Sequence, residues 1–360
     1  MKISDIADII NVSVKDPSKS GIDVFVGLEH YDIAEPVIKR CGSTKMLSTA
    51  AKKFEAGDVL IARRNVYLQR AAVARFSGLT SGDSIILRVK ENLSTKDTDY
   101  ETMCKLLPFV LNSINFWDYA NTNADGTMSK RLSPAMLLEY EFNLPSIDEQ
   151  KVLADKLWAA YEVKQSYLRM IEATEKMVKS QFIEMFGDKE QNAKNGVLGD
   201  FCALKAGKSV NADEIQSDSG DGNYPCYGGN GLRGYVTSYS HDGEYIIIGR
   251  QGALCGNVNI AQGRFYATEH AIVVSPKEDI NCCWLYYALK EMHLNQYARG
   301  VAQPGLAVNQ LERLPFGVPS LDRQSKFESI YQQADKSEFE LKKSIEAIDA
   351  VIKSLINSEL

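Results

Sequence analysis

One short segment of the chain occurs twice. LPSIDEQ occupies residues 144–150, and VPSLDRQ occupies residues 318–324, so the two copies differ by an offset of 174 in the numbering. The same offset aligns IEATEKMVKS at 171–180 with IEAIDAVIKS at 345–354. It also aligns four earlier pairs of residues, which are Gly126 with Gly300, Leu132 with Leu306, Leu137 with Leu311 and Phe142 with Phe316. Three matching groups in one register indicate an internal duplication, so we expect the main structural elements in two copies.

Each copy of the segment has the signals of a helix start. A proline restricts the residue before it to extended conformations. Ser146 and Glu149 form a capping box, in which each side chain satisfies a free amide of the first helical turn. The second copy keeps Ser320 but has Arg323 in place of the glutamate, so only half of the box is present there.

Apolar residues follow each helix start with a period near 3.5, the pattern of a coiled-coil seam. Each predicted helix is about 35 residues long, whereas helices in globular proteins average about 11. Two similar stripes in one chain favour an intramolecular antiparallel pair, with Lys164 and Glu338 as polar interruptions. The alternative is that each helix packs only on its own globular domain. The seam residues are Leu153, Leu157, Ala160, Tyr167, Ile171 and Val178, and then Phe327, Tyr331, Ala334, Leu341, Ile345, Ile348, Ile352 and Leu355.

The segments before each helix are rich in β-branched residues and bounded by glycine or polar turns, as strands are. Gly57 precedes the first of these runs and Gly243 the corresponding later one, an offset of 186, so the two halves differ by insertions. We predict an α+β protein in which two mixed, β-rich domains alternate with two long helices. The expected divisions are a first domain at 1–143, a helix at 144–188, a second domain at 189–317 and a helix at 318–360.

Composition fits this plan. A chain of 360 residues exceeds what one hydrophobic core usually organises. No apolar run approaches the roughly 18 residues of a membrane-spanning helix, and the first residues include acids where a signal peptide is apolar. We therefore expect a cytoplasmic protein without a membrane segment. The seven cysteines form no CxxC pair, which favours reduced thiols and predicts no structural metal.

The formal net charge is −6, which disfavours binding to nucleic acid, because Lys and Arg make most contacts to phosphate. No segment is a basic tail or a strongly basic domain. DNA binding by this chain would therefore depend on local basic clusters, with a more basic partner supplying further phosphate contacts.

The sequence lacks the motifs of several enzyme classes. AGKSV at 206–210 is not a phosphate-binding loop, because Cys202 occupies the position where the motif GxxxxGK[ST] requires glycine. The chain has no Asn-Pro dipeptide for the catalytic loop of an adenine methyltransferase, and its four histidines are far apart. We therefore expect no catalytic residues in this chain.

Four segments, in this order of domains and helices, resemble the specificity subunit of Type I restriction-modification systems over essentially the whole chain. They are FVGLEHYD at 25–32, SQFIEMFGD at 180–188, YPCYGGNGLRGYV at 224–236 and GVAQPGLAVNQLERLPFGVPSLDRQ at 300–324. The resemblance implies two target-recognition domains, each of which contacts one half of a split double-stranded DNA target. It also implies that the antiparallel helices set the spacer between the halves.

The same resemblance implies that catalysis belongs to partner subunits. Two modification subunits that dock along the helices would methylate adenine with S-adenosylmethionine, and restriction subunits using ATP and Mg²⁺ are allowed as further partners. This chain itself is then expected to hold no cofactor.

The candidate DNA-contacting residues follow from the chemistry of base recognition. Arginine can bridge guanine O6 and N7, and asparagine or glutamine can bridge adenine N6 and N7. The alternative for each candidate is a solvated surface residue or, for the tyrosines, a core or turn aromatic. The first domain offers Arg63, Arg64, Asn65, Tyr67, Gln69 and Arg70, and beside Ser129 it offers Lys130 and Arg131, which align with Pro304 and Gly305 after Gln303. The second domain offers Tyr227, Asn230, Arg233, Tyr235, Arg250 and Gln251, followed by Thr268 and His270.

A different class of function is also open at this point. A duplicated coiled-coil scaffold could use the two domains to bind protein or glycan. The salt dependence of binding separates the two hypotheses, because DNA affinity falls steeply with salt.

Overall fold

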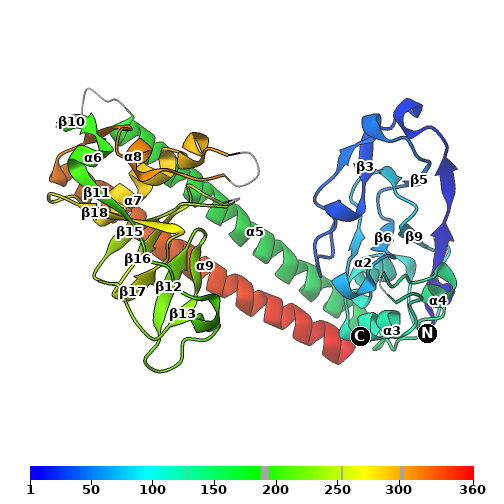
Figure 1. Cartoon of the computed structure of the whole chain (residues 1–360). Helices are drawn as coiled ribbons and strands as arrows, with labels where there is room; N and C mark the ends of the chain where they lie inside the picture. Colours follow the sequence, from blue (N-terminus) through cyan, green and yellow to red (C-terminus); the bar gives the residue numbers. More distant parts are fainter. Residues whose placement is uncertain (128, 188–193, 253, 301–303) are drawn as a thin grey trace. The chain divides into compact units, whose positions relative to one another are not determined.

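The computed structural model describes residues 1–127, 129–187, 194–252, 254–300 and 304–360. The chain forms two compact units, the first with residues 1–168 and 342–360 and the second with residues 169–341. Each unit therefore contains one globular part and a segment of both long helices, α5 (Ile147–Phe186) and α9 (Leu321–Glu359) (Figure 1). The division of the sequence at residues 143, 188 and 317 stays a prediction about domains, because the compact units are divided within the helices.

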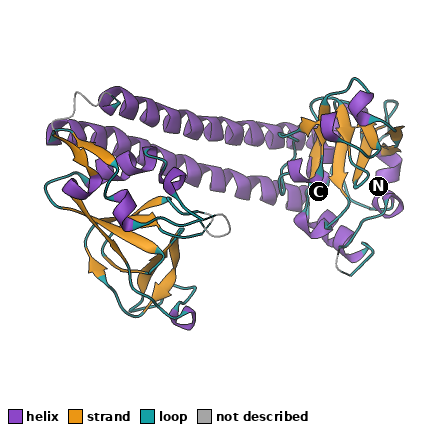
Figure 2. Ribbon diagram, turned by 45° about the horizontal axis from the view of Figure 1, so that its top comes forward, coloured by secondary structure: helices purple, strands orange, loops and turns teal. Residues whose placement is uncertain are grey.

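The first unit contains two sheets, with helices packed beside them (Figure 2). Its antiparallel four-stranded sheet has the order β1 (Ala7–Ile10), β9 (Ser84–Val89), β6 (Val59–Ala62), β7 (Ala71–Val73). Its five-stranded sheet has the order β2 (Val12–Val14), β5 (Ala51–Phe54), β8 (Gly78–Thr80), β3 (Val24–Val26), β4 (Gly42–Ser43). The shorter helices of this unit are α1 (Ile3–Ile6), α2 (Tyr100–Val110), α3 (Ile114–Thr122) and α4 (Pro134–Leu138).

The second unit repeats this plan. Its four-stranded antiparallel sheet has the order β11 (Cys202–Ala206), β18 (Ala271–Pro276), β15 (Tyr245–Gly249), β16 (Val258–Ala261). A second sheet has the order β13 (Gly231–Val236), β12 (Tyr224–Gly228), β17 (Arg264–Ala267), β14 (His241–Asp242), and β10 (Lys194–Val197) pairs with β19 (Pro315–Val318). The shorter helices are α6 (Leu198–Phe201), α7 (Cys282–Glu291) and α8 (Val308–Leu311).

The registers of the corresponding sheets match position by position. Val59 pairs with Leu87 in the first unit, and Ile246 pairs with Val274 in the second. Ile246 therefore corresponds to Val59, and Val274 to Leu87, each with an offset of 187 in the numbering. The pairing of β6 with β7 and of β15 with β16 has the same offset. The offset of 186 between Gly57 and Gly243 is therefore wrong for these strands by one position. This difference matters because a shift of one residue moves every side chain of a strand to the opposite face of the sheet.

The first helix start confirms the glutamate half of the predicted capping box. The amide and hydroxyl groups of Ser146 donate to Glu149 Oε2 at 2.9 and 2.7 Å. In the second copy the guanidinium of Arg323 instead donates to the carbonyl oxygen of Met185, in the last turn of α5, and lies 5.3 Å from the Phe186 ring centroid. The arginine that replaces the glutamate thus satisfies a free carbonyl at a helix C-terminus.

The repeated glutamine has the same role in both copies of the segment. Gln150 and Gln324 are fully buried, and the side-chain amide of each donates to the proline carbonyl five residues earlier. Gln150 also donates to Asp97 O at 2.6 Å, and Gln324 accepts from Asn281 N at 2.8 Å. Both partners lie just before the first short helix that follows a sheet, α2 or α7. The glutamine therefore ties the start of each long helix to the adjoining globular part.

The long helices run antiparallel within each unit, as predicted. In the first unit Lys164, in the first half of α5, donates to Asp349 near the end of α9 at 2.6 Å. In the second unit Phe182, near the end of α5, lies with its ring 5.2 Å from that of Phe327 near the start of α9. All the predicted seam residues are buried or half-buried.

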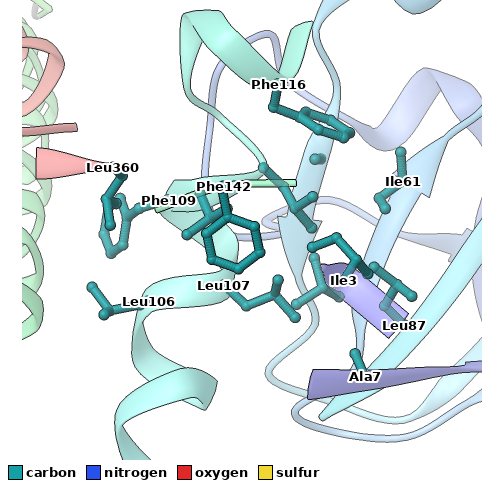
Figure 3. Close-up of a cluster of buried hydrophobic side chains, with 14 of the residues drawn as sticks. Ile3, Ala7, Ile61, Leu87, Leu106, Leu107, Phe109, Phe116, Phe142 and Leu360 are labelled. Atoms are coloured by element: carbon teal, nitrogen blue, oxygen red, sulfur yellow. The ribbon is translucent and has the colours of Figure 1, made fainter. Parts of the chain in front are cut away.

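The core of the first unit is assembled from distant segments of the chain. Ile3 of α1, Phe109 of α2, Phe142 before α5 and Leu360 after α9 belong to one buried cluster (Figure 3). The core of the second unit joins the equivalent elements, with Trp284 of α7 among its largest buried side chains. In each unit this packing supports the sheet whose strand β6 or β15 leads into the candidate site.

Candidate nucleic-acid interface

Two loops build the candidate site of the first unit. Residues 63–65 follow β6, and they pair with residues 130–132. Asn65 N donates to Lys130 O at 2.8 Å, and Leu132 N donates to Arg63 O at 2.9 Å. The two basic groups, which are widely separated in the sequence, therefore lie side by side.

The side chains of these loops form one polar network. Arg64 Nε donates to Ser129 Oγ at 3.0 Å, and Ser129 Oγ donates to Asn65 Oδ1 at 2.9 Å. The carboxylate of Asp83, which precedes β9, lies 3.8 Å from a guanidinium nitrogen of Arg64 and equally far from one of Arg131. Two arginines thus share one acidic partner, which leaves the network with a net positive charge available to phosphate or to base edges.

Two of the predicted contact residues also brace the loops. Arg70 donates to Leu28 O at 2.9 Å and to Arg64 O at 3.1 Å, and burial lowers the pKa of its guanidinium. Lys130 Nζ donates to Asn121 O at 2.9 Å. These bonds hold the backbone that carries Arg64, so the first role of Arg70 and Lys130 is to position the loop.

The remaining candidates of the first unit lie around a short 3₁₀ helix, Val66–Leu68. Tyr67 at its centre is 59% exposed, which suits a side chain that packs on a sugar or a base. Asn65 and Gln69 flank it with φ angles of 57° and 50°, in the left-handed region that non-glycine residues rarely adopt. Arg63 is half-buried, and its Nε has no hydrogen-bond partner within the described part of the chain.

The candidate site of the second unit surrounds a hollow of about 510 Å³. The turn between β12 and β13 contributes Asn230, and β13 itself contributes Arg233, both exposed. The segments after β15 and β17 contribute Gln251 and His270. Gln251 Oε1 accepts from His270 Nδ1 at 2.8 Å. Four candidates from three separate segments of the sequence thus line one concave surface.

The close approach of strands in this unit depends on glycine. A Cβ atom on Gly249 would lie 2.0 Å from Gly229 O, and one on Gly229 would lie 2.7 Å from Gln251 O. The glycines of the YGGNGLRG segment therefore do more than permit a turn, because they allow the hairpin to lie against the loop that carries Gln251.

The other candidates of the second unit lie outside this lining. Arg250 Nη1 donates to Glu269 O at 3.3 Å, and Tyr227 is half-buried with its ring 5.6 Å from that of Phe265. Burial raises the pKa of the Tyr227 hydroxyl. Tyr235 is half-buried in β13, where its backbone pairs with Gln216.

Thr268 is one further candidate of this unit, and Gln303 is the residue that aligns with Ser129. Thr268 is fully buried, and Gln303 lies outside the described residues.

The two sites share one backbone frame. Arg63 N donates to Asp83 O at 2.9 Å, and Arg250 N donates to His270 O at 2.8 Å. The carbonyl oxygen of Arg63 accepts from Leu132 N, and that of Arg250 accepts from Leu306 N. Two residues after each arginine, Asn65 N donates to Lys130 O and Gly252 N donates to Pro304 O. Arg63 therefore corresponds to Arg250, and Asp83 to His270, with the same offset of 187 as the strands.

At matching places in this frame the side chains differ. Arg64 corresponds to Gln251, and both form an isolated bridge, Arg64 to Arg131 and Gln251 to Gly305. In one unit Arg64 has Asp83 as its ionic partner, and in the other Gln251 has His270 as its hydrogen-bond partner. The same scaffold thus presents different polar side chains in each unit.

Asp83 is a site residue that the sequence did not single out. An acidic residue at the start of a strand is common, and the partners of this one come from two other segments. The repeat could have identified Asp83 from the sequence, since an offset of 187 aligns it with the candidate His270.

Neither a metal cluster nor a membrane span is found in the described parts of the chain. Within those ranges, no three His, Cys, Asp or Glu side chains gather closely enough to hold a metal ion. Among the helices described, none is both long and apolar enough to cross a membrane.

Comparison with known proteins finds a matching family model and relatives over parts of this chain. Residues 190–349 match the family model of the Type I restriction modification DNA specificity domain. The Type I restriction enzyme EcoprrI specificity subunit of Escherichia coli is 48% identical over 151 residues, which are 42% of this chain and 38% of that protein. A putative type I restriction enzyme specificity subunit of Haemophilus influenzae is 35% identical over 112 residues, which are 30% of this chain and 29% of that protein. These matches span less than two fifths of either relative's own length.

Two solved structures share the fold along almost the whole chain. The S subunit of a Type-I restriction-modification system from M. genitalium has a TM-score of 0.62 and 17% identity, covering 99% of this chain and 94% of that one. A chain from a structural study of assembly and conformational transition in the type I R-M system has a TM-score of 0.59 and 15% identity, covering 100% and 97%. Residues 190–349 therefore match the DNA specificity domain of Type I restriction-modification systems, and the chain as a whole shares the fold of these two structures.

Proposed function

We propose that this chain is a non-catalytic DNA sequence-recognition subunit of a type I restriction-modification complex. Each globular part contacts one half of a two-part DNA target. The pair of long helices sets the spacer between the halves and docks the modification subunits. Methylation with S-adenosylmethionine, and cleavage with ATP and Mg²⁺ where restriction subunits join, belong to those partners.

One observation carries this proposal, namely that the two units have the same backbone frame but different polar side chains at matching places in it. A split DNA target requires two similar surfaces, since each must dock on the same double helix, and it requires different side chains, since each half has its own base sequence. A scaffold that binds one ligand twice would be expected to keep the same recognition residues in both copies.

The local charge supports the same conclusion. The first site combines Arg63, Arg64 and Arg131 with the acid Asp83, although the whole chain carries a net charge of −6. Local positive charge on an acidic chain fits a subunit that makes base contacts itself while a partner supplies much of the phosphate contact.

Selection from a random duplex DNA library tests the proposal. The chain, purified with its modification partner, is expected to enrich one sequence in two parts at a fixed separation. Its affinity for that sequence is expected to fall about 10³-fold or more between roughly 50 and 200 mM salt if six or more phosphates are contacted. Enrichment of no sequence, together with binding that is insensitive to salt, would instead support the protein- or glycan-binding scaffold.

A further inference from the structure

Two pairs of polar side chains lie at matching positions of the backbone frame that the two units share. We infer that Arg64 with Asp83 in the first unit, and Gln251 with His270 in the second, are corresponding specificity pairs, each selecting one base of its half-site. This inference rests on the proposed function and adds to it the residues and the type of base. Arg64 is expected to select guanine and Gln251 to select adenine.

The first step is positional. Arg64 and Gln251 each follow the arginine whose amide donates to the residue at 83 or 270. Each also forms an isolated β-bridge, Arg64 with Arg131 and Gln251 with Gly305. The backbone therefore presents both side chains from the same point of the same frame, at the end of β6 or β15.

The second step is orientation. A guanidinium or an amide distinguishes bases only if its plane is held, because a freely rotating side chain can satisfy several patterns of donors and acceptors. Arg64 is held by Ser129 at 3.0 Å and by the Asp83 carboxylate at 3.8 Å. Gln251 is held by His270 at 2.8 Å. In each unit the orienting residue comes from the same place, directly before β9 or β18.

The third step is access. The side chains of Arg64 and Asp83 are 45% and 31% exposed, and that of His270 is 39% exposed. These three side chains are therefore open to a ligand, and Gln251 is half-buried. In the second unit Gln251 and His270 also line the hollow that Asn230 and Arg233 border.

The fourth step is chemistry. The free edge of the Arg64 guanidinium can donate twice, which matches the O6 and N7 acceptors of guanine. The Gln251 amide nitrogen can donate to adenine N7, while the second lone pair of its oxygen accepts from adenine N6. The carboxylate of Asp83 would repel the phosphates of the DNA backbone. Its place beside two arginines therefore favours a role in orienting those arginines over a contact with the DNA backbone. Asp83 and His270 are therefore positioning residues, and Arg64 and Gln251 make the base contact.

Exchanging the pair tests the inference. Gln251→Arg combined with His270→Asp gives the second unit the pair of the first. With the modification partner present, selection from a duplex library is expected to change the preferred base at one position of one half-site, from adenine to guanine. The other half-site and the spacer are expected to stay unchanged. A matched control is Gln262→Arg, which adds an arginine at an exposed turn bonded to Glu244 and is expected to leave the motif as it was.

Single variants keep the test decisive if the exchanged pair does not fold. Gln251→Ala is expected to reduce discrimination at that one position about 5- to 150-fold. Asp83→Asn is expected to relax preference at one position of the other half-site. Unchanged base preference in both single variants, or a uniform loss of affinity for all sequences, would overturn the inference.

The wild-type complex separates this inference from the proposed function. If it selects a two-part motif and the variants leave the base preferences intact, the specificity pairs are wrong and the proposed function stands. If the wild type selects no two-part motif, the proposed function itself fails.

Discussion

Arg64 and Arg70, which lie close together in the sequence, show how much the environment of a side chain decides. Arg64 has an exposed guanidinium beside an acid and a serine, whereas Arg70 donates to two carbonyl oxygens within its own unit. Both have the residue type that contacts guanine, and nothing in their sequence neighbours distinguishes them. The structure separates them because an arginine committed to backbone carbonyls has fewer donors left for DNA.

Replacing each arginine by methionine should therefore have different effects, mainly on DNA affinity at position 64 and mainly on the stability of the fold at position 70. Arg64→Met is expected to lower the affinity of the complex for its selected DNA about 5- to 150-fold, with the free energy of unfolding changed by less than about 0.5 kcal/mol. Arg70→Met removes donors to two carbonyl groups and is expected to lower the free energy of unfolding by about 1–3 kcal/mol. Urea unfolding and DNA titration measure the two effects. An Arg70→Met protein as stable as the wild type would remove the bracing role assigned to that residue.

At the scale of elements, the start of each long helix is the joint between a helix and its globular part. The buried glutamine makes this joint in both units, accepting from Asn281 in one and donating to Asp97 in the other. The capping box of Ser146 and Glu149 and its replacement at Arg323 show that the cap varies between the copies while the glutamine is the same.

Replacing this glutamine by leucine tests the joint. Gln324→Leu leaves Asn281 N and Pro319 O without their partner, and it is expected to reduce the free energy of unfolding by about 2–4 kcal/mol. The exposed Gln332, whose side chain bonds to Glu328 on the same helix, provides the control, since Gln332→Leu is expected to change that free energy by less than about 0.5 kcal/mol. Equal effects of the two substitutions in urea unfolding would show that the joint adds no stability.

Elements were more predictable than sites, for a physical reason. The caps, the seam and the strand runs are encoded by neighbours in sequence, so Ser146, Leu157 and residues 244–265 could be interpreted locally. The polar network at Arg64 draws on three segments, at 63–65, 83 and 129–131, which only the folded sheet brings together. An error of one position in the internal offset was enough to hide that Arg64 corresponds to Gln251.

At the scale of the whole molecule, the proposed function depends on duplication with different side chains at a few matching positions. The two units share strand registers, helix starts and the hydrogen bonds around their candidate sites. They differ in the side chains that this common frame presents. A protein that must recognise two different half-sites on one double helix needs this combination.

The most direct test of the proposed role of the helices is to shorten them. Removing residues 165–171 of α5 and 342–348 of α9 keeps the seam in phase, because Lys164 lies opposite Asp349 and each deletion is one heptad. Such a deletion corresponds to about 10 Å of helix, or about three base pairs. The measurement is a genome-wide map of methylated sites in cells carrying the shortened chain and its modification partner. If the helices set the spacer, the map will show the same two half-sites with a spacer shortened by up to about three base pairs, whereas changed half-sites or an unchanged spacer would contradict that role.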